Sequence, residues 1–224
     1  KGSRRMAIVY KNAKDVKVGG VKIAVYGGAG IGKTRLCNTA PKPLIVSAES
    51  GLLSLRNESA DYVEIKTMRD LDEVYKYAKS ADCTHETICL DSASEIAETV
   101  FEEFAKNEKD NRQAYLKMGD AMIHAIRNFR DLPNRHVVFN FKMKMVEDES
   151  TDSIFYVPMA PGKMIGHQVP YMFDELFCMQ IKKDGTRFLQ TTADRQRFCK
   201  DRSGSLEKEE PANLTSIIDK IIGT

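Results

Sequence analysis

The stretch Gly27-Gly28-Ala29-Gly30-Ile31-Gly32-Lys33-Thr34 decides the fold. It follows a short run rich in β-branched residues at 21–26 and precedes a segment at 33–38 that favours a short helix. Glycines let backbone N–H groups turn inward around phosphate oxygens, while a lysine neutralises terminal phosphates and a hydroxyl ligates Mg²⁺. A strand, this loop and a helix in this order predict a phosphate-binding loop for ATP, with Thr34 as a ligand of Mg²⁺.

The rest of the chain alternates between strand and helix patterns. Strands are expected at 44–48, 62–65, 87–91, 137–141 and 154–157, and helices at 68–79, 94–107, 112–132 and after Pro211. Two further strands, at 175–182 and 186–192, flank Lys183-Asp184-Gly185, which favours a tight antiparallel turn. We expect an α/β fold with a mainly parallel twisted sheet, flanking helices and an antiparallel hairpin at its C-terminal edge.

Composition narrows the class of protein. The chain has 224 residues, 42% of them hydrophobic, and a net charge of +2, which fits one folded domain and excludes compositional disorder. Lys1-Gly2-Ser3 is typical of a cloning remnant, so we expect an N-terminal segment at 1–20 and a nucleotide-binding domain at 21–224. No apolar run approaches the roughly 18 to 20 residues of a membrane span, and no Cys-x-x-Cys pair occurs. These features favour a cytoplasmic protein with reduced thiols and no membrane partner.

Two carboxylates follow predicted strands. Asp91 ends the strand at 87–91 and is the predicted carboxylate on the Mg²⁺ side, although it could instead cap the next helix. Glu49 follows the strand at 44–48 and is the predicted catalytic base, with a solvated loop glutamate as the alternative. Parallel strands bring their carboxyl ends to one crevice, so we expect both residues near Lys33.

The predicted nucleotide-binding set consists of the glycine-rich loop and one cysteine beyond it. Burial in the short helix is the simpler expectation for that cysteine. The set is Gly27, Gly28, Ala29, Gly30, Ile31, Gly32, Lys33, Thr34 and Cys37.

A pair of cations, Lys200 and Arg202, follows the last predicted strands. In isolation such a pair most often forms a solvated strand edge. Next to a phosphate-binding loop it gains a second interpretation, because charge that develops on a transferred phosphoryl group needs compensation. Lys200 and Arg202 are therefore candidates to complete the site of a neighbouring subunit.

Taken in order, these motifs resemble the RecA-like ATPases, and within them the phage-encoded nucleotide-binding proteins associated with single-strand annealing and recombination. The resemblance covers residues 23–222. It rests on the glycine-rich loop, Pro41-Lys42-Pro43, Glu49, Asp91-Ser92 and the Lys-x-Arg-x-Gly run at 200–204. It implies a RecA-like P-loop fold whose catalytic glutamate follows the second strand, whereas the AAA+ class places its base beside the metal-side aspartate, where this chain has Ser92.

The resemblance also implies partners and further site residues. Lys200 and Arg202 would insert into the next subunit of a homo-oligomer, and Asn140 or Lys142 would stand where a glutamine usually senses the γ-phosphate. The DNA-contacting loops would correspond to 106–113 and 142–163. Single-stranded DNA and a single-strand-binding protein are the implied partners, and a bacterial host cell is the implied location.

Local charge gives a weaker signal for nucleic acid. Residues 127–144 contain five Lys or Arg against one Asp, and residues 182–202 contain seven against three acids. Phenylalanines interleaved with these cations could stack unpaired bases, although alternating Phe residues in strands usually belong to a core.

The sequence thus favours a Mg²⁺-dependent ATPase that binds single-stranded DNA and acts in phage-type recombination or annealing. One alternative is a nucleotide-gated oligomeric binding module with little hydrolysis. A small-molecule P-loop kinase is less favoured, because no Arg-rich lid follows the helices.

Overall fold

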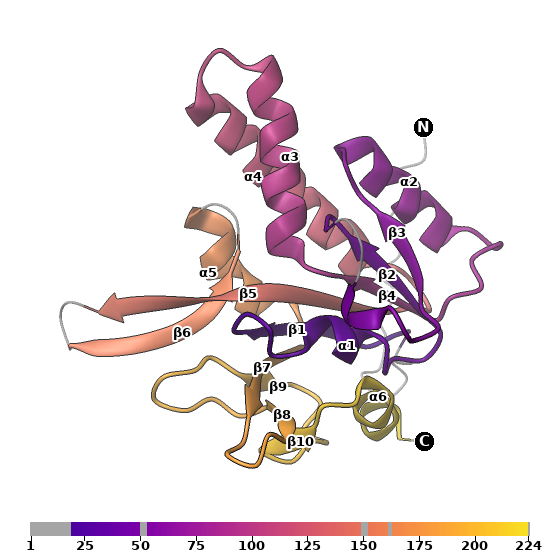
Figure 1. Cartoon of the computed structure of the whole chain (residues 1–224), viewed down its shortest axis with the longest axis vertical. Helices are drawn as coiled ribbons and strands as arrows, with labels where there is room; N and C mark the ends of the chain where they lie inside the picture. Colours follow the sequence, from indigo (N-terminus) through magenta and orange to yellow (C-terminus); the bar gives the residue numbers. More distant parts are fainter. Residues whose placement is uncertain (1–18, 50–52, 149–151, 161–162, 224) are drawn as a thin grey trace, which may run out of the picture.

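A computed structural model describes residues 19–49, 53–148, 152–160 and 163–223, and its centre is a ten-stranded sheet (Figure 1). The strand order is β10-β8-β7-β1-β5-β4-β2-β3, with β6 beside β5 and β9 beside β7. The strands are β1 (Lys22–Gly27), β2 (Pro43–Ser47), β3 (Asp61–Glu64), β4 (Thr87–Leu90), β5 (His136–Asp148), β6 (Ser153–Met159), β7 (Glu175–Ile181), β8 (Arg187–Gln190), β9 (Lys200–Asp201) and β10 (Glu209–Pro211).

The six central strands, from β7 to β3, are all parallel to their neighbours. Strand β8 pairs antiparallel with β7 and with β10 at one edge. Gly185, in the turn between β7 and β8, has a φ of 88°, as a tight turn requires. The predicted α/β fold, with its mainly parallel sheet and antiparallel C-terminal hairpin, is confirmed.

Helices cover both faces of the sheet (Figure 1). They are α1 (Lys33–Cys37), the 3-10 helix η2 (Leu53–Leu55), α2 (Met68–Lys79), α3 (Ala93–Asn107), α4 (Asn111–Arg130), α5 (Lys163–Met172) and α6 (Leu214–Ile222). Alternate residues of β1 face opposite cores: Ala24 and Tyr26 pack with the apolar residues of α2 to α5, whereas Ile23 and Val25 pack with α1, η2 and α6. Burial on both faces explains why the central strands are almost continuously apolar. None of the described helices is both long and apolar enough to cross a membrane.

Strand β5 is much longer than the predicted strand at 137–141. Beyond the sheet it pairs antiparallel with β6, from Lys142 opposite Met159 to Asp148 opposite Ser153, and the pair projects as an arm (Figure 1). The segment 142–163, expected as a DNA-contacting loop, is therefore mostly β-hairpin up to Met159. The other expected DNA-contacting loop, 106–113, consists largely of the end of α3 and the start of α4.

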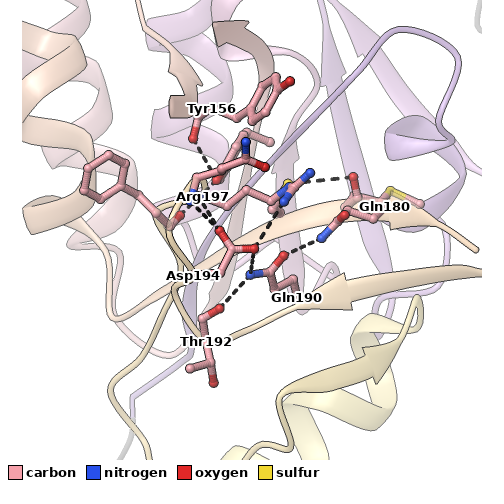
Figure 2. Close-up of polar contacts among 11 residues, drawn as sticks. Tyr156, Gln180, Gln190, Thr192, Asp194 and Arg197 are labelled. Carbon is pink, nitrogen blue, oxygen red and sulfur yellow. Dashed lines mark hydrogen bonds and ion pairs between the residues drawn. The ribbon is translucent and has the colours of Figure 1, made fainter. Parts of the chain in front are cut away.

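A polar cluster fixes the segment that follows β8 (Figure 2). The carboxylate of Asp194 accepts hydrogen bonds from the backbone N–H groups of residues 196 and 197 at 2.7 Å and from the Gln190 amide at 3.1 Å. It also pairs with the Arg197 guanidinium at 3.1 Å, and this guanidinium lies 5.2 Å from the ring centroid of Tyr156 on the arm. The cluster thus ties the end of β8 to the middle of the arm.

Tyr26, the last residue before the glycine-rich loop, joins the same region to β1. Its buried hydroxyl donates to the backbone carbonyls of Tyr156 and Phe198, each at 3.1 Å. Burial raises the pKa of Tyr26 far above its usual range, so the hydroxyl stays protonated and remains a donor.

Candidate nucleotide-binding site

A cleft of about 760 Å³ opens where the carboxyl ends of β1, β2 and β4 meet. Residues of the glycine-rich loop and both predicted carboxylates line it. They are Gly27, Gly28, Ala29, Gly30, Gly32, Lys33, Thr34, Arg35, Glu49, Leu53, Ser54, Asp91, Ser92, Lys142, Met143, Met159 and Arg187. The structure therefore brings the glycine-rich loop, Asp91 and Glu49 into one cleft.

The loop takes its shape from two glycines with positive φ. Gly30 has a φ of 69° and Gly32 a φ of 107°, values that residues with a side chain rarely adopt. Gly32 is also the N-cap of α1, so the chain enters the helix directly before Lys33 and Thr34. The predicted order of strand, loop and short helix is confirmed.

Lys33 closes back over the loop. Its ammonium group donates to the backbone carbonyls of Gly27 and Gly28, each at 2.9 Å. Burial lowers the pKa of Lys33, while Asp91 and Glu49 act in the opposite direction. A phosphate that enters the cleft would exchange these neutral acceptors for charged oxygens, which bind an ammonium more strongly.

Asp91 is buried in the floor of the cleft and is held there by Asn140. The side-chain nitrogen of Asn140 donates to Asp91 Oδ1 at 2.8 Å and to the Lys33 carbonyl at 3.1 Å. Asn140 is fully buried and does not line the cleft, so it lies beneath the site instead of facing the γ-phosphate as a sensor would. The other predicted sensor, Lys142, does line the cleft, where it pairs with Glu98 at 3.0 Å and with Glu95.

The donors in the cleft suit Mg²⁺. Thr34 and Asp91 both line it and offer the oxygen ligands that this cation prefers. Among the described residues no group of three or more His, Cys, Asp or Glu could hold a metal by itself. At a phosphate site Mg²⁺ usually takes one or two protein ligands and completes its shell with phosphates and water, so these two residues would be enough to hold it.

Glu49 lies at the exposed rim of the cleft, two residues beyond β2. Its backbone N–H donates to the Ser47 hydroxyl at 3.1 Å. Partial burial raises the pKa of Glu49, and repulsion from Asp91 and Glu95 adds to the increase. A carboxylate with a raised pKa is a stronger base than a free glutamate, which suits proton abstraction.

Cys37 is not a nucleotide contact. It is fully buried in the core beneath α1, where Asn140 Nδ2 lies 3.1 Å from its sulfur, and it does not line the cleft. The short helix turns this residue away from the loop and into the core, so the structure does not bring it together with the rest of the predicted nucleotide-binding set. The Ile31 side chain likewise packs against the core, and only its backbone belongs to the loop.

Lys200 and Arg202 lie at the opposite ends of the strands from the cleft. Strand β9 places them beside the start of β7, and Arg202 lines a separate cavity of about 450 Å³ near Lys22. The Lys200 ammonium donates to the carbonyls of Pro170 at 2.7 Å and Phe173 at 2.5 Å, so it caps the end of α5. The Arg202 side chain is 69% exposed and pairs with Asp174 at 3.1 Å.

Arg187 is a cleft residue that the sequence did not point to. It begins β8, and its Nε donates to the Ile31 carbonyl at 2.7 Å. Arg187 lies 156 residues after Ile31 and belongs to no sequence motif together with the glycine-rich loop. No local sequence pattern could therefore have predicted it.

The chain was compared with known structures, curated proteins and protein families. A solved structure titled "Structural and biochemical analysis of a prototypical ATPase from the type III secretion system of pathogenic bacteria" aligns at 15% identity with a TM-score of 0.47. The alignment covers 74% of this chain, which spans about half (53%) of that chain. No curated protein matches the sequence significantly. The family described as "AAA domain" matches residues 19–203, and since this is most of the chain, the chain belongs to the AAA domain family.

Proposed function

We propose that this protein is a Mg²⁺-dependent ATPase whose phosphate loop, metal-side carboxylate and water-activating glutamate share one cleft. The observation that carries the proposal is the joint presence of Lys33, Asp91 and Glu49 in the lining of that cleft. Membership of the AAA domain family supports nucleotide binding.

The cleft residues divide the work of hydrolysis. Lys33 and the loop N–H groups bind the phosphate chain, while Thr34 and Asp91 hold Mg²⁺, which when bound supplies positive charge to the β- and γ-phosphates. Ser92, beside Asp91, has no carboxylate, so the role of general base falls to Glu49. Glu49 would orient a water molecule for attack on the γ-phosphate and accept its proton.

We further propose that the protein binds single-stranded DNA as a homo-oligomer and that its ATP hydrolysis serves DNA recombination or annealing of the phage type. The sequence resemblance and the two cation-rich stretches support this part. The β5–β6 arm offers a projecting surface with Lys144 exposed. The arm also carries Glu147 and Asp152, so binding would depend on local contacts more than on net charge.

Hydrolysis of ATP by the full chain, with and without single-stranded DNA, tests the proposal. Wild-type protein should release phosphate only with Mg²⁺, and DNA should change the rate. Glu49→Gln should bind ATP as the wild type does, but its rate of hydrolysis should fall by about 100-fold or more. A positioned general base typically contributes about 10²–10⁴-fold to the rate. Lys33→Ala should lose binding.

Each alternative has its own result in this assay. Tight ATP binding without measurable turnover would favour the nucleotide-gated binding module. Phosphate transferred to an added metabolite would favour the kinase. Turnover that survives unchanged in Glu49→Gln would remove Glu49 from the mechanism.

A further inference from the structure

Arg187 is a cation at the mouth of the cleft that the proposed mechanism does not use. Its side chain crosses from β8 to the glycine-rich loop, where Nε donates to the Ile31 carbonyl at 2.7 Å. The residue lines the same cleft as Lys33 and Asp91. Arg187 therefore adds a further long cationic side chain to the place where phosphates would bind.

Arg187 lies directly against the loop residue before Lys33. A Cβ atom on Gly32 would be 3.0 Å from Arg187 Nε and 3.2 Å from its Cδ, closer than such atoms normally approach. The arginine side chain thus occupies the space that a side chain at position 32 would need. This close fit places the guanidinium beside the backbone that cradles phosphate.

The other cations of the cleft already have partners. Arg35 pairs with Glu58 at 3.0 Å, Lys142 pairs with Glu95 and Glu98, and Lys33 donates to two carbonyls. Arg187, by contrast, has no carboxylate within ion-pair distance in the part of the chain that the structure describes. Its hydrogen bond to Ile31 uses only Nε, and its two terminal nitrogen atoms donate no hydrogen bond to any of the described residues.

The strand that carries Arg187 is fixed at its other end. Gln190 closes β8 and bonds to the Gln180 side chain, to the Thr192 carbonyl at 2.8 Å and to Asp194 at 3.1 Å (Figure 2). Side chains carried by a rigid strand lose less conformational freedom when they bind a ligand. Arg187 is therefore held ready at the cleft.

We propose that Arg187 is a nucleotide-binding residue that contacts the phosphate chain from within the same subunit. Its Nε keeps the Ile31 carbonyl, and its terminal nitrogens donate to phosphate oxygens, which the planar guanidinium suits well. This inference rests on the proposed nucleotide-binding function. It assigns to the cleft an arginine in cis, whatever Lys200 and Arg202 do between subunits.

Binding measurements on the full chain test the assignment. A fluorescent ATP analogue is titrated into wild-type protein and displaced by unlabelled ATP or by inorganic tripolyphosphate. Arg187→Ala and Arg187→Gln should raise the dissociation constants of both ligands by about tenfold. Hydrogen bonds to charged groups contribute more to binding than hydrogen bonds between neutral groups. Arg187→Lys, which keeps the charge, should recover a large part of the loss. Arg195→Ala, which removes an exposed arginine elsewhere, is the matched control and should bind like the wild type.

The glutamine variant separates phosphate binding from a purely structural role. It retains a donor for the Ile31 carbonyl but carries no charge, so wild-type affinity in Arg187→Gln would overturn the proposal. Weaker ATP with unchanged tripolyphosphate would also overturn it, because the contact would then be with the base or the ribose. If lysine restored nothing compared with glutamine, charge would not be the cause and the proposal would fail.

Two further measurements keep these outcomes distinct. Circular dichroism melts show whether each variant is folded, and the comparison of lysine with glutamine decides the question if alanine unfolds the chain. Wild-type protein that binds neither ligand would overturn the nucleotide-binding function itself. Wild-type binding with unaffected Arg187 variants would overturn only the role of Arg187.

Discussion

The side-chain nitrogen of Asn140 donates a 2.8 Å hydrogen bond to the carboxylate of Asp91, and both residues are buried. Asp91 follows β4 and Asn140 lies within β5, so two adjacent strands fix the orientation of the metal-side carboxylate. Residues that orient a metal ligand typically contribute 10–100-fold to metal affinity or activity. We therefore expect Asn140 to act as a positioning residue that orients Asp91 for Mg²⁺.

We expect Asn140→Leu to raise the Mg²⁺ concentration for half-maximal ATP hydrolysis by about 10-fold or more. The leucine keeps the branching at Cγ, although it is larger, and it cannot donate to Asp91. Asn128→Leu, at an exposed position of α4, is the control and should leave the Mg²⁺ dependence unchanged. An identical Mg²⁺ dependence in both variants would show that Asp91 needs no such support.

Subunit mixing tests the role of Arg202. Lys33→Ala and Arg202→Ala proteins should each be inactive alone, and together they should recover part of the wild-type turnover. Recovery is expected because a mixed assembly contains sites in which an intact Lys33 faces an intact Arg202 of the neighbour. Lys200 caps α5, so Lys200→Ala should lower thermal stability. A loss of activity in that variant would therefore not separate a role in catalysis from a role in folding. No recovery at any mixing ratio would exclude an action of Arg202 across subunits.

Glu175 should make stability depend on pH. Burial raises the pKa of Glu175 to about 7, and repulsion from Asp201 contributes. In the unfolded chain the pKa is about 4.3, so between these values the folded state binds more protons and its stability falls as the pH rises. The contribution of this group is fully present below about pH 4.3 and is lost as the pH rises through about 7.

The check is chemical denaturation of wild-type protein and Glu175→Gln from pH 5 to pH 8. As the pH rises, the free energy of unfolding of the wild type should fall relative to that of Glu175→Gln. Taking the difference cancels groups that both proteins share, such as His136, whose pKa burial lowers. A constant difference across this range would show that Glu175 does not titrate in it.

The aromatic core behind the cleft should dominate stability. Phe139 is fully buried in β5, with ring centroids 5.0 Å from Phe173 and 6.3 Å from Phe141. Phe139→Ala should lower the free energy of unfolding by about 3–5 kcal/mol, as large-to-small changes in cores do. Phe198 is 48% exposed, so Phe198→Ala should lower the free energy of unfolding much less. Urea titration of both variants measures the two losses. Equal losses would mean that Phe198 is as tightly packed as the core.

Local signals explain which elements could be predicted. The glycine-rich loop carries its own conformational requirements, and α2 begins at a capping box in which Thr67 and Asp70 bond each other's backbone N–H groups. Both were predicted with nearly correct bounds. Helix α5 was missed because Pro170 lies inside it and Gly166 weakens its pattern.

Long-range pairing explains what the sequence could not reveal. Strand β5 extends beyond residue 141 only because β6 supplies antiparallel partners there. Asn140 contacts Asp91, which lies 49 residues earlier in the chain. Arg187 reaches the glycine-rich loop from β8, near the edge of the sheet. Such contacts depend on the order of strands in the sheet, which residue spacing does not encode.

Tyr26 connects the strand that leads into the glycine-rich loop to two segments far away in the sequence. It precedes the first loop glycine, yet its hydroxyl holds the main chain at Tyr156 in the arm and at Phe198. Displacing Tyr26 from its place in β1 would break these two hydrogen bonds or move both segments with it. Tyr26→Phe would remove the two hydrogen bonds and keep the buried ring.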